Sequence, residues 1–158
     1  MENKGQLTAL DIYSHKLHEL KRRARRAGAH NITTRQISSN KVIKKLQNRA
    51  DRVLIDAPCT GLGVLRRNPD AKWKIDADFL ERVKQTQQQI LSVYASMVKP
   101  GGKLIYATCS ILKEENQEQV EQFLKSPKGT EFTLEKDNLI SPAKSGFDGF
   151  YMARMIRS

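Results

Sequence analysis

Apolar and polar positions vary along the chain with two different periods, and this pattern predicts strands separated by helices. Short apolar runs bounded by polar or turn residues predict strands over residues 6–12, 31–37, 52–57, 103–108, 131–135 and 150–156. Apolar residues spaced three or four positions apart predict helices over 14–27, 41–48, 76–99 and 113–125. Strands that alternate with helices are typical of an α/β fold with a mostly parallel sheet and helices on both faces.

Capping and turn residues indicate where these elements end. We expect Ser14 to cap the first helix and Gly28 to stop it, because these residue types are common at the two ends of helices. The Pro-Gly-Gly sequence at 100–102 is expected to break the longest helix, 76–99. One apolar stripe on that helix is formed by Phe79, Val83, Ile90, Tyr94 and Met97.

Length and composition are typical of a single globular domain over residues 1–158. The chain is 39% hydrophobic and 28% charged, and a chain of this size can bury a sizeable core. No apolar run approaches the ~20 residues of a membrane span, and the first residues lack a signal-peptide pattern. Two cysteines are too few for a disulfide scaffold or for a structural zinc site, which takes four ligands. We therefore expect a cytoplasmic protein with neither a membrane nor a metal partner.

Positive charge is concentrated in the first third of the chain. The net charge is +11, and residues 1–52 hold 13 Lys and Arg against 4 Asp and Glu. A basic block on an otherwise balanced chain indicates a polyanionic partner such as RNA. An ordinary solvated helix face is the alternative. One face of the helix predicted at 14–27 carries Lys21, Arg22, Arg23, Arg25 and Arg26.

The residues that follow the predicted strands are the candidates for chemistry, because ligands bind beyond the carboxyl ends of parallel strands. These residues are Asp11, the Asp56-Ala57-Pro58-Cys59 segment and the Thr108-Cys109-Ser110 segment. If the two cysteine-bearing strands are neighbours, ~4.8 Å apart, both sulfurs open into one crevice. A cysteine there can act as a nucleophile, or the pair can be two small buried hydrophobic residues.

Asp11 and a short glycine motif have two interpretations each. An acid after a strand can hold ribose hydroxyls in nucleotide-binding folds, or it can cap the next helix. Gly61-Leu62-Gly63 is weak evidence for phosphate binding. More simply, these glycines let the loop turn closely around a ligand.

Two longer segments resemble a known family. Residues 56–74, DAPCTGLGVLRRNPDAKWK, followed by residues 101–116, GGKLIYATCSILKEEN, resemble the RsmB/Sun (Fmu) family of RNA cytosine-5 methyltransferases. Residues 148–151 look like that family's closing strand, and residues 7–31 look like its second strand and the helix after it. The resemblance implies a Rossmann-like fold of the class that uses S-adenosylmethionine.

The resemblance also implies a mechanism and roles for residues. Cys109 would attack carbon 6 of cytosine, which makes carbon 5 able to accept a methyl group, and Cys59 would help to release the methylated product. Asp56 would hydrogen-bond the cytosine edge and contact the cofactor, Asp11 would hold the cofactor ribose, and Pro58 would shape the turn that presents Cys59. Contacts to RNA, most simply ribosomal RNA, would come from Arg66, Arg67, Lys72, Trp73 and Lys74. Ordinary core packing is the alternative for Trp73.

The sequence departs from the family at the cofactor site. The family's glycine-rich loop after the first strand is absent, and Gln36-Ile37-Ser38-Ser39 stands where the family often has an acid. We expect a catalytic fragment that binds S-adenosylmethionine poorly by itself. Without that first strand, the strands at 6–12 and 52–57 would either keep exposed edges or pair directly. A basic RNA-binding remnant without catalysis is the alternative function.

Overall fold

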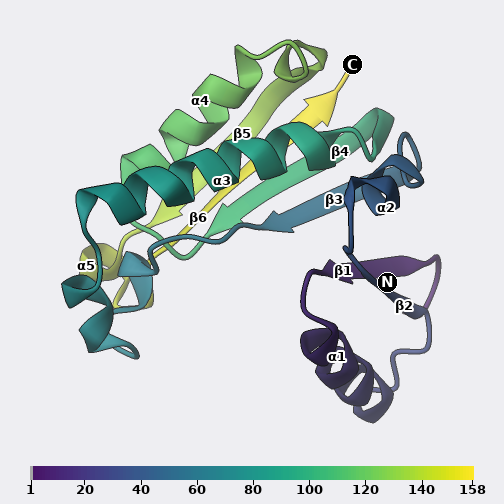
Figure 1. Cartoon of the computed structure of the whole chain (residues 1–158), viewed down its shortest axis with the longest axis horizontal. Coiled ribbons are helices and arrows are strands. Elements are labelled where there is room, and N and C mark those ends of the chain that lie inside the picture. Colours follow the sequence, from purple (N-terminus) through teal and green to yellow (C-terminus); the bar gives the residue numbers. More distant parts are fainter. Residues whose placement is uncertain (1) are drawn as a thin grey trace. The chain divides into compact units, whose positions relative to one another are not determined.

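The computed structural model describes residues 2–158 and has an α/β architecture (Figure 1). The chain divides into two compact units, one running through Lys45 and the other from Leu46 to Ser158. The expectation of a single domain stays a prediction, and each unit is described by itself. The strands are β1 (Leu7–Asp11), β2 (Ile32–Gln36), β3 (Ala50–Asp56), β4 (Val98–Thr108), β5 (Phe132–Ile140) and β6 (Phe150–Arg157). The helices are α1 (Ser14–Arg26), α2 (Asn40–Lys44), α3 (Ala77–Ala95), α4 (Gln117–Leu124) and α5 (Pro142–Ser145).

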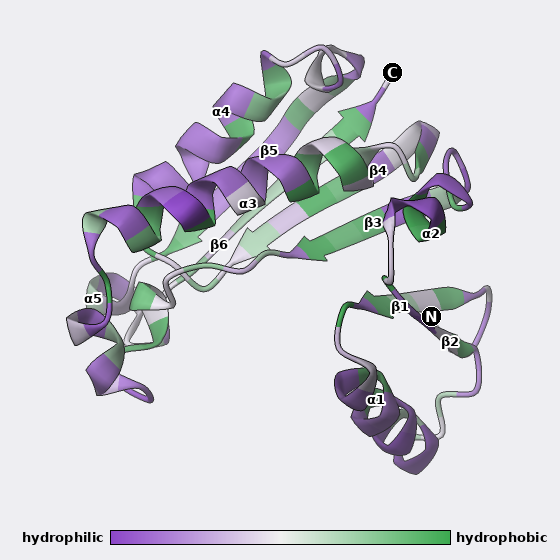
Figure 2. Ribbon diagram, in the orientation of Figure 1, coloured by the Kyte–Doolittle hydropathy of each residue, from purple (hydrophilic) through white to green (hydrophobic). Residues whose placement is uncertain are grey.

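The first unit is a parallel β1–β2 pair joined through α1. Leu7 pairs with Ile32 and Asp11 with Gln36, so both strands end at the same edge. Helix α1 is almost entirely hydrophilic (Figure 2), and Leu17 is its one buried residue. The expected cap at Ser14 is wrong. Tyr13 holds the N-cap position, and its side chain makes no capping hydrogen bond. The Tyr13 N–H donates to the Asp11 carboxylate two residues earlier.

The second unit contains a four-stranded sheet in the order β3-β4-β6-β5. Strands β3 and β4 are parallel, while β6 runs antiparallel to both β4 and β5. Strands β3, β4 and β5 therefore share one direction, which confirms a mostly parallel sheet. Strand β1 pairs with β2 alone and β3 with β4 alone. Within its own unit, each of β1 and β3 keeps one edge without a strand partner among residues 2–158, and the direct pairing of these two strands stays a prediction.

Helices α3 and α4 lie together on one face of this sheet (Figure 1). Val53 and Ile55 are buried, whereas Leu54 between them points to the opposite face and is 68% exposed. Each strand of a sheet has this alternation, because successive side chains point to opposite faces. None of the helices within residues 2–158 has the length and apolar character needed to cross a membrane.

Helix α3 buries a different line of residues from the apolar stripe that the pattern predicts. Gln87, Leu91 and Ala95 are fully buried, while Phe79, Val83, Ile90 and Tyr94 are only half-buried. The helix begins after Asp76, whose side chain accepts a hydrogen bond from Phe79 N at 2.6 Å. It ends at Ala95 rather than Lys99, because Met97 O accepts hydrogen bonds from the backbone that leads into β3, and β4 begins at Val98.

Candidate functional site

The two cysteines lie at one edge of the sheet, where β3 and β4 end side by side. Asp56 at the end of β3 pairs with Ala107 in β4, and Ala57 N then donates to Ala107 O at 2.9 Å. The chain beyond each strand therefore leaves the sheet at the same edge. The Sγ atoms of Cys59 and Cys109 are 3.3 Å apart, and both side chains are half-buried. The expectation that the two sulfurs share one crevice is confirmed.

The short contact gives the two thiols different acidities. The hydrogen bond from Cys59 lowers the pKa of Cys109 to about 7, against the opposing effects of burial and of the Asp56 and Glu115 carboxylates. The same hydrogen bond, together with burial, raises the pKa of Cys59. As the pH rises through about 7 the pair therefore loses one proton, from Cys109, while Cys59 keeps its proton. The thiolate is the nucleophilic form of cysteine.

Three loops meet backbone to backbone beside the cysteines. Gly63 N donates to Cys109 O at 2.9 Å, and Gly149 N donates to Gly63 O at 2.7 Å. Gly61 adopts φ +74°, in the left-handed region that glycine favours. The expectation that these glycines make room for a ligand needs correction at Gly63, because its close neighbours are the Gly149 and Cys109 backbones.

A buried carboxylate joins the loops that carry the two cysteines, and sequence reasoning missed it. Glu115 Oε1 accepts from Thr60 N at 2.8 Å, and its other oxygen accepts from Thr60 Oγ1 at 2.6 Å and from Ser110 Oγ. Gln87 Nε2 on α3 also donates to Glu115 Oε1, at 3.1 Å. Two adjacent acids, Glu114 and Glu115, stand in the sequence, and no periodicity marks which of them turns inward.

Asn116 divides the helix predicted over 113–125. Its Oδ1 accepts from Thr108 Oγ1 at 2.5 Å, and its Nδ2 donates to Ser110 O at 2.9 Å. These bonds hold Asn116 in a non-helical conformation, φ −115° and ψ −102°, between a 3-10 turn at Lys113–Glu115 and α4. The helix is interrupted because Asn116 supports the Cys109 loop.

The basic residues after Cys59 occupy an exposed surface. Trp73 is 79% exposed, which overturns the alternative that it packs in the core. Lys72 Nζ lies 4.7 Å from the centre of the Trp73 ring. Arg67 forms an ion pair with Asp148 at 2.8 Å, and Arg66 donates to the Gly146 carbonyl, so both arginines join this surface to the loop before β6. Lys74 is exposed and directly follows Trp73.

The expected cofactor residues divide between the two units. Asp11 belongs to the first unit, at the end of β1, and Asp56 and Pro58 belong to the second. Asp11 Oδ1 accepts from Tyr13 N at 2.8 Å, and within residues 2–158 its other carboxylate oxygen has no hydrogen-bond partner. The Pro58 carbonyl accepts from Gln87 Nε2 at 2.9 Å. Gln36, which stands where an acid was expected, donates to Ile12 O at 3.0 Å.

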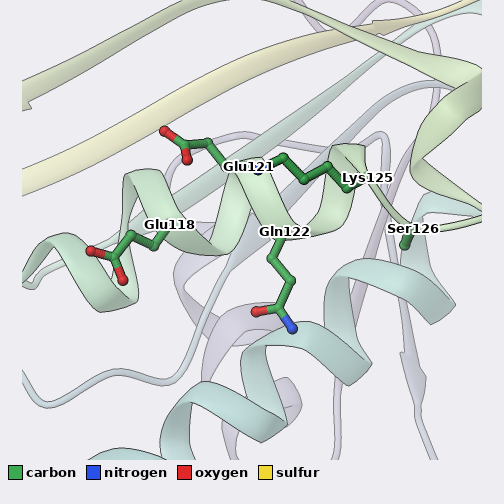
Figure 3. Close-up of a pocket in the computed structure, with 5 residues that line it drawn as sticks. All are labelled: Glu118, Glu121, Gln122, Lys125 and Ser126. Carbon is green, nitrogen blue, oxygen red and sulfur yellow. The ribbon is translucent and has the colours of Figure 1, made fainter.

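A separate hollow on α4 has the wrong chemistry for a polyanion. Its lining side chains project from α4 and from the turn after it (Figure 3), and they are Glu118, Glu121, Gln122, Lys125 and Ser126. Two carboxylates oppose an anionic ligand, and none of the residues beside the cysteines takes part in the lining. We assign this hollow no role.

Relatives of this chain are RNA methyltransferases by name. The probable ribosomal RNA small subunit methyltransferase B of Bacillus subtilis (strain 168) is 35% identical over 98% of this chain, and the match covers 38% of that protein. The ribosomal RNA small subunit methyltransferase B of Erwinia tasmaniensis is 45% identical over 68% of this chain and 26% of its own length. The chain thus spans well under half the length of these relatives.

Solved structures show the same fold. The structure of NSun6 from Pyrococcus horikoshii with SFG is similar to this chain, with a TM-score of 0.85 and 26% identity. The match covers 99% of this chain and 42% of the NSun6 chain. A methyltransferase homolog from the same organism matches 100% of this chain and 55% of its own, with a TM-score of 0.82 and 25% identity. The fold is therefore the Rossmann-like methyltransferase fold. A family model described as "16S rRNA methyltransferase RsmB/F" matches residues 1–156, and the chain accordingly belongs to the RsmB/F methyltransferase family.

Proposed function

We propose that this chain carries the catalytic residues of an RNA cytosine-5 methyltransferase that uses S-adenosylmethionine, with ribosomal RNA as substrate. The observation that supports this most directly is the 3.3 Å contact between the Cys59 and Cys109 sulfurs. That contact lowers the pKa of Cys109 to about 7, so a nucleophilic thiolate is present at neutral pH. The ribosomal RNA substrate is taken from the names of the relatives.

The Cys109 thiolate adds to carbon 6 of the target cytosine and forms a carbon–sulfur bond. The electron pair of the 5,6 double bond then makes carbon 5 nucleophilic. When bound, S-adenosylmethionine supplies the methyl group that carbon 5 accepts. A base removes the proton from carbon 5, the double bond re-forms, and the Cys109 thiolate leaves. The Asp56 carboxylate raises the pKa of Cys109. It also hydrogen-bonds the cytosine edge, and this bond favours the redistribution of charge in the ring when the Cys109 sulfur adds to carbon 6.

Cys59 assists the final step through its hydrogen bond to the departing sulfur. The bond that lowers the pKa of Cys109 in the free protein also makes Cys109 a better leaving group. Because Cys59 keeps its proton, it does not compete as a second nucleophile. Its role in product release follows from the same contact.

The residues present fit part of a cofactor site. Asp11 stands at the carboxyl end of a parallel strand, where nucleotide-binding folds hold the ribose. Tyr13 N–H donates to one carboxylate oxygen, and the other oxygen would be the acceptor for a ribose hydroxyl. Asp56 and Pro58, at the end of β3 in the second unit, are the cofactor contacts proposed for that unit. The sequence has no glycine-rich loop of the kind that supplies several N–H groups to a nucleotide. We therefore propose that this chain by itself binds S-adenosylmethionine weakly.

The exposed surface after Cys59 fits an unstacked strand of RNA. The target base must leave its stack to reach Cys109. Lysine and arginine side chains attract phosphates, and the exposed face of Trp73 can stack on a base. The residues proposed for RNA contact are Arg66, Arg67, Lys72, Trp73 and Lys74.

Binding of RNA without catalysis is the second candidate, and the basic face of α1 favours it. The two functions differ in one measurement. We would incubate the protein with RNA containing 5-fluorocytosine and saturating S-adenosylmethionine, and resolve protein–RNA adducts on a denaturing gel. A methyltransferase forms an adduct that Cys109→Ser abolishes. A binding protein shows only association that weakens with salt, and that result would overturn the catalytic proposal.

A further inference from the structure

Glu115 accepts hydrogen bonds from the loops of both cysteines, and the two hydroxyls that it binds, those of Thr60 and Ser110, also lie 3.4 Å from each other. Glu115 is fully buried. On the Cys59 side it accepts from the backbone N–H and the hydroxyl of Thr60, at 2.8 and 2.6 Å. On the Cys109 side it accepts from the hydroxyl of Ser110. Each of these partners directly follows a cysteine, so the carboxylate links the two chain segments that set the sulfur positions.

Gln87 extends this link to the other side of Cys59. Its Nε2 donates to Glu115 Oε1 at 3.1 Å and to Pro58 O at 2.9 Å. Its buried Oε1 has no hydrogen-bond partner among the described residues. A buried polar atom without a partner has a cost, whereas the Gln87 Nε2 group donates both to Pro58 O and to the Glu115 carboxylate. Cys59 is thus held through the residue before it and the residue after it.

The carboxylate has only neutral donors around it. Four hydrogen bonds reach its two oxygens, from Thr60, Ser110 and Gln87, and none of these contacts is an ion pair. This arrangement requires a side chain that accepts hydrogen bonds at both of its terminal atoms. A carboxylate accepts at both oxygens, whereas an amide accepts only at its single oxygen. Glutamine at this position would place an NH₂ group against donors.

We propose that Glu115 is the positioning residue of the thiol pair, holding the Cys59 and Cys109 loops at the separation that lets one sulfur donate a hydrogen bond to the other. Its importance for methyl transfer rests on the proposed function. The positioning itself does not, since it concerns the protein alone.

The negative charge of Glu115 and its positioning of the two loops have opposite effects on the pKa of Cys109. A measurement of that pKa in variants therefore tests the proposal. The negative charge raises the pKa of Cys109. If charge were its main effect, Glu115→Gln would lower that pKa. If positioning is its main effect, Glu115→Gln weakens the thiol–thiol hydrogen bond, and the pKa of Cys109 rises toward that of a free thiol. A residue that served stability alone would leave the pKa unchanged in the folded variant.

The experiment measures how fast iodoacetamide alkylates Cys109 between pH 5.5 and 9.5, with the modified peptide identified by mass spectrometry. We expect Glu115→Gln to shift the midpoint upward and to slow alkylation at pH 7 by about tenfold, since a free thiol has a pKa of about 8.5. Glu114→Gln is the matched control, because it removes the charge of the neighbouring acid, which accepts from Gln119 Nε2 through its backbone carbonyl and not through its carboxylate. A downward or unchanged midpoint in folded Glu115→Gln overturns the proposal.

Two further measurements keep the result interpretable. Ser110→Ala removes one donor to Glu115 and leaves the charge in place, so it should shift the midpoint upward by a smaller amount even if Glu115→Gln fails to fold. An unchanged midpoint in Ser110→Ala would also contradict the positioning role. If the alkylation profile shifts but the wild type never forms the 5-fluorocytosine adduct, the proposed function fails and the positioning role stands. If Glu115→Gln forms the adduct at the wild-type rate although its alkylation midpoint has shifted, the positioning has no importance for methyl transfer, and that part of the proposal is overturned.

Discussion

Gly149 donates its backbone N–H to the Gly63 carbonyl at 2.7 Å, so the loop before β6 lies directly against the loop that follows Cys59. A Cβ on Gly63 would lie 2.3 Å from Gly149 O and 2.7 Å from Cys109 O. Both neighbours are backbone atoms, so no flexible side chain can move aside. The position of the Cys109 loop therefore depends on a glycine at residue 63.

We expect Gly63→Ala to reduce the rate of 5-fluorocytosine adduct formation by about a hundredfold, because a displacement of about 1 Å near a reacting atom has effects of that size. Gly146→Ala is the control. Gly146 has a positive φ, +72°, which Gly63 does not have, and a Cβ on Gly146 meets nothing within 4 Å. We expect it to cost about 1–2 kcal/mol of stability through backbone strain and to keep the adduct rate. Equal rates in the two variants would contradict this assignment.

Removal of the Cys59 thiol should leave the protein attached to its substrate. Cys59→Ala removes the hydrogen bond that makes Cys109 a good leaving group. We expect it to accumulate a covalent complex with unmodified RNA, in a relative that contains the cofactor loop as well as in this chain supplied with excess cofactor. Denaturing gels of the purified protein measure the complex. Cys59→Ala/Cys109→Ser should form none, and an absence of excess complex in Cys59→Ala would remove the release role.

Reactivity of Cys109 should rise with pH through neutrality. The thiolate is the reactive form, so the alkylation rate is low below the pKa of about 7 and reaches a plateau above it. Cys59→Ala loses the stabilising hydrogen bond, and its curve should move to higher pH by about one unit or more. Alkylation kinetics across pH, followed by peptide mass spectrometry, measure both curves. Superimposed curves would show that Cys59 does not control the acidity of Cys109.

The exposed aromatic ring at Trp73 should contribute to RNA affinity and not to folding. Stacking of a base on an aromatic side chain is worth about 1–3 kcal/mol, so Trp73→Ala should weaken binding of single-stranded RNA by about tenfold or more. The thermal midpoint should stay close to that of the wild type because Trp73 is 79% exposed. Trp73→Phe keeps an aromatic face and serves as the control. A loss of stability without a loss of affinity would assign Trp73 a structural role instead.

The two sulfurs should also form a disulfide when an oxidant is supplied. Diamide, a thiol-specific oxidant, accepts the two hydrogens as the sulfurs close from 3.3 Å to a bond of about 2.05 Å. The intact mass should fall by two hydrogens and return with dithiothreitol, while Cys59→Ser should not show the change. Because oxidation consumes the nucleophile, adduct formation should stop and recover in step with the mass. Retained adduct formation in the oxidised protein would contradict the role of Cys109.

The elements of the fold were predictable because each carries a local pattern. The continuous apolar run from Val53 to Ile55 identifies β3, and helical spacing identifies α1 and α3. The ends of elements were less predictable where they depend on partners distant in sequence. Helix 113–125 was expected to be continuous, and Asn116 interrupts it through bonds to the Cys109 loop.

The cysteine pair was predictable from its position after two strands, whereas its support was not. Gln87 lies on the buried line of α3, but it is polar, so a search for apolar periodicity passes over it. Glu115 is one of two adjacent acids, and only the three-dimensional contacts show which of them is buried. Residues that act through hydrogen bonds to other loops leave no periodic trace in a sequence.

The shared proton between Cys59 and Cys109 limits how the site can respond to an electrophile. Once the Cys109 sulfur has ionised, ionisation of Cys59 becomes unfavourable, because the Cys59 proton stabilises the negative charge on Cys109. Above about pH 7 the crevice consequently holds a single negative charge, so its attack on a base is ordered: the Cys109 sulfur bonds to carbon while the Cys59 sulfur keeps its proton beside it.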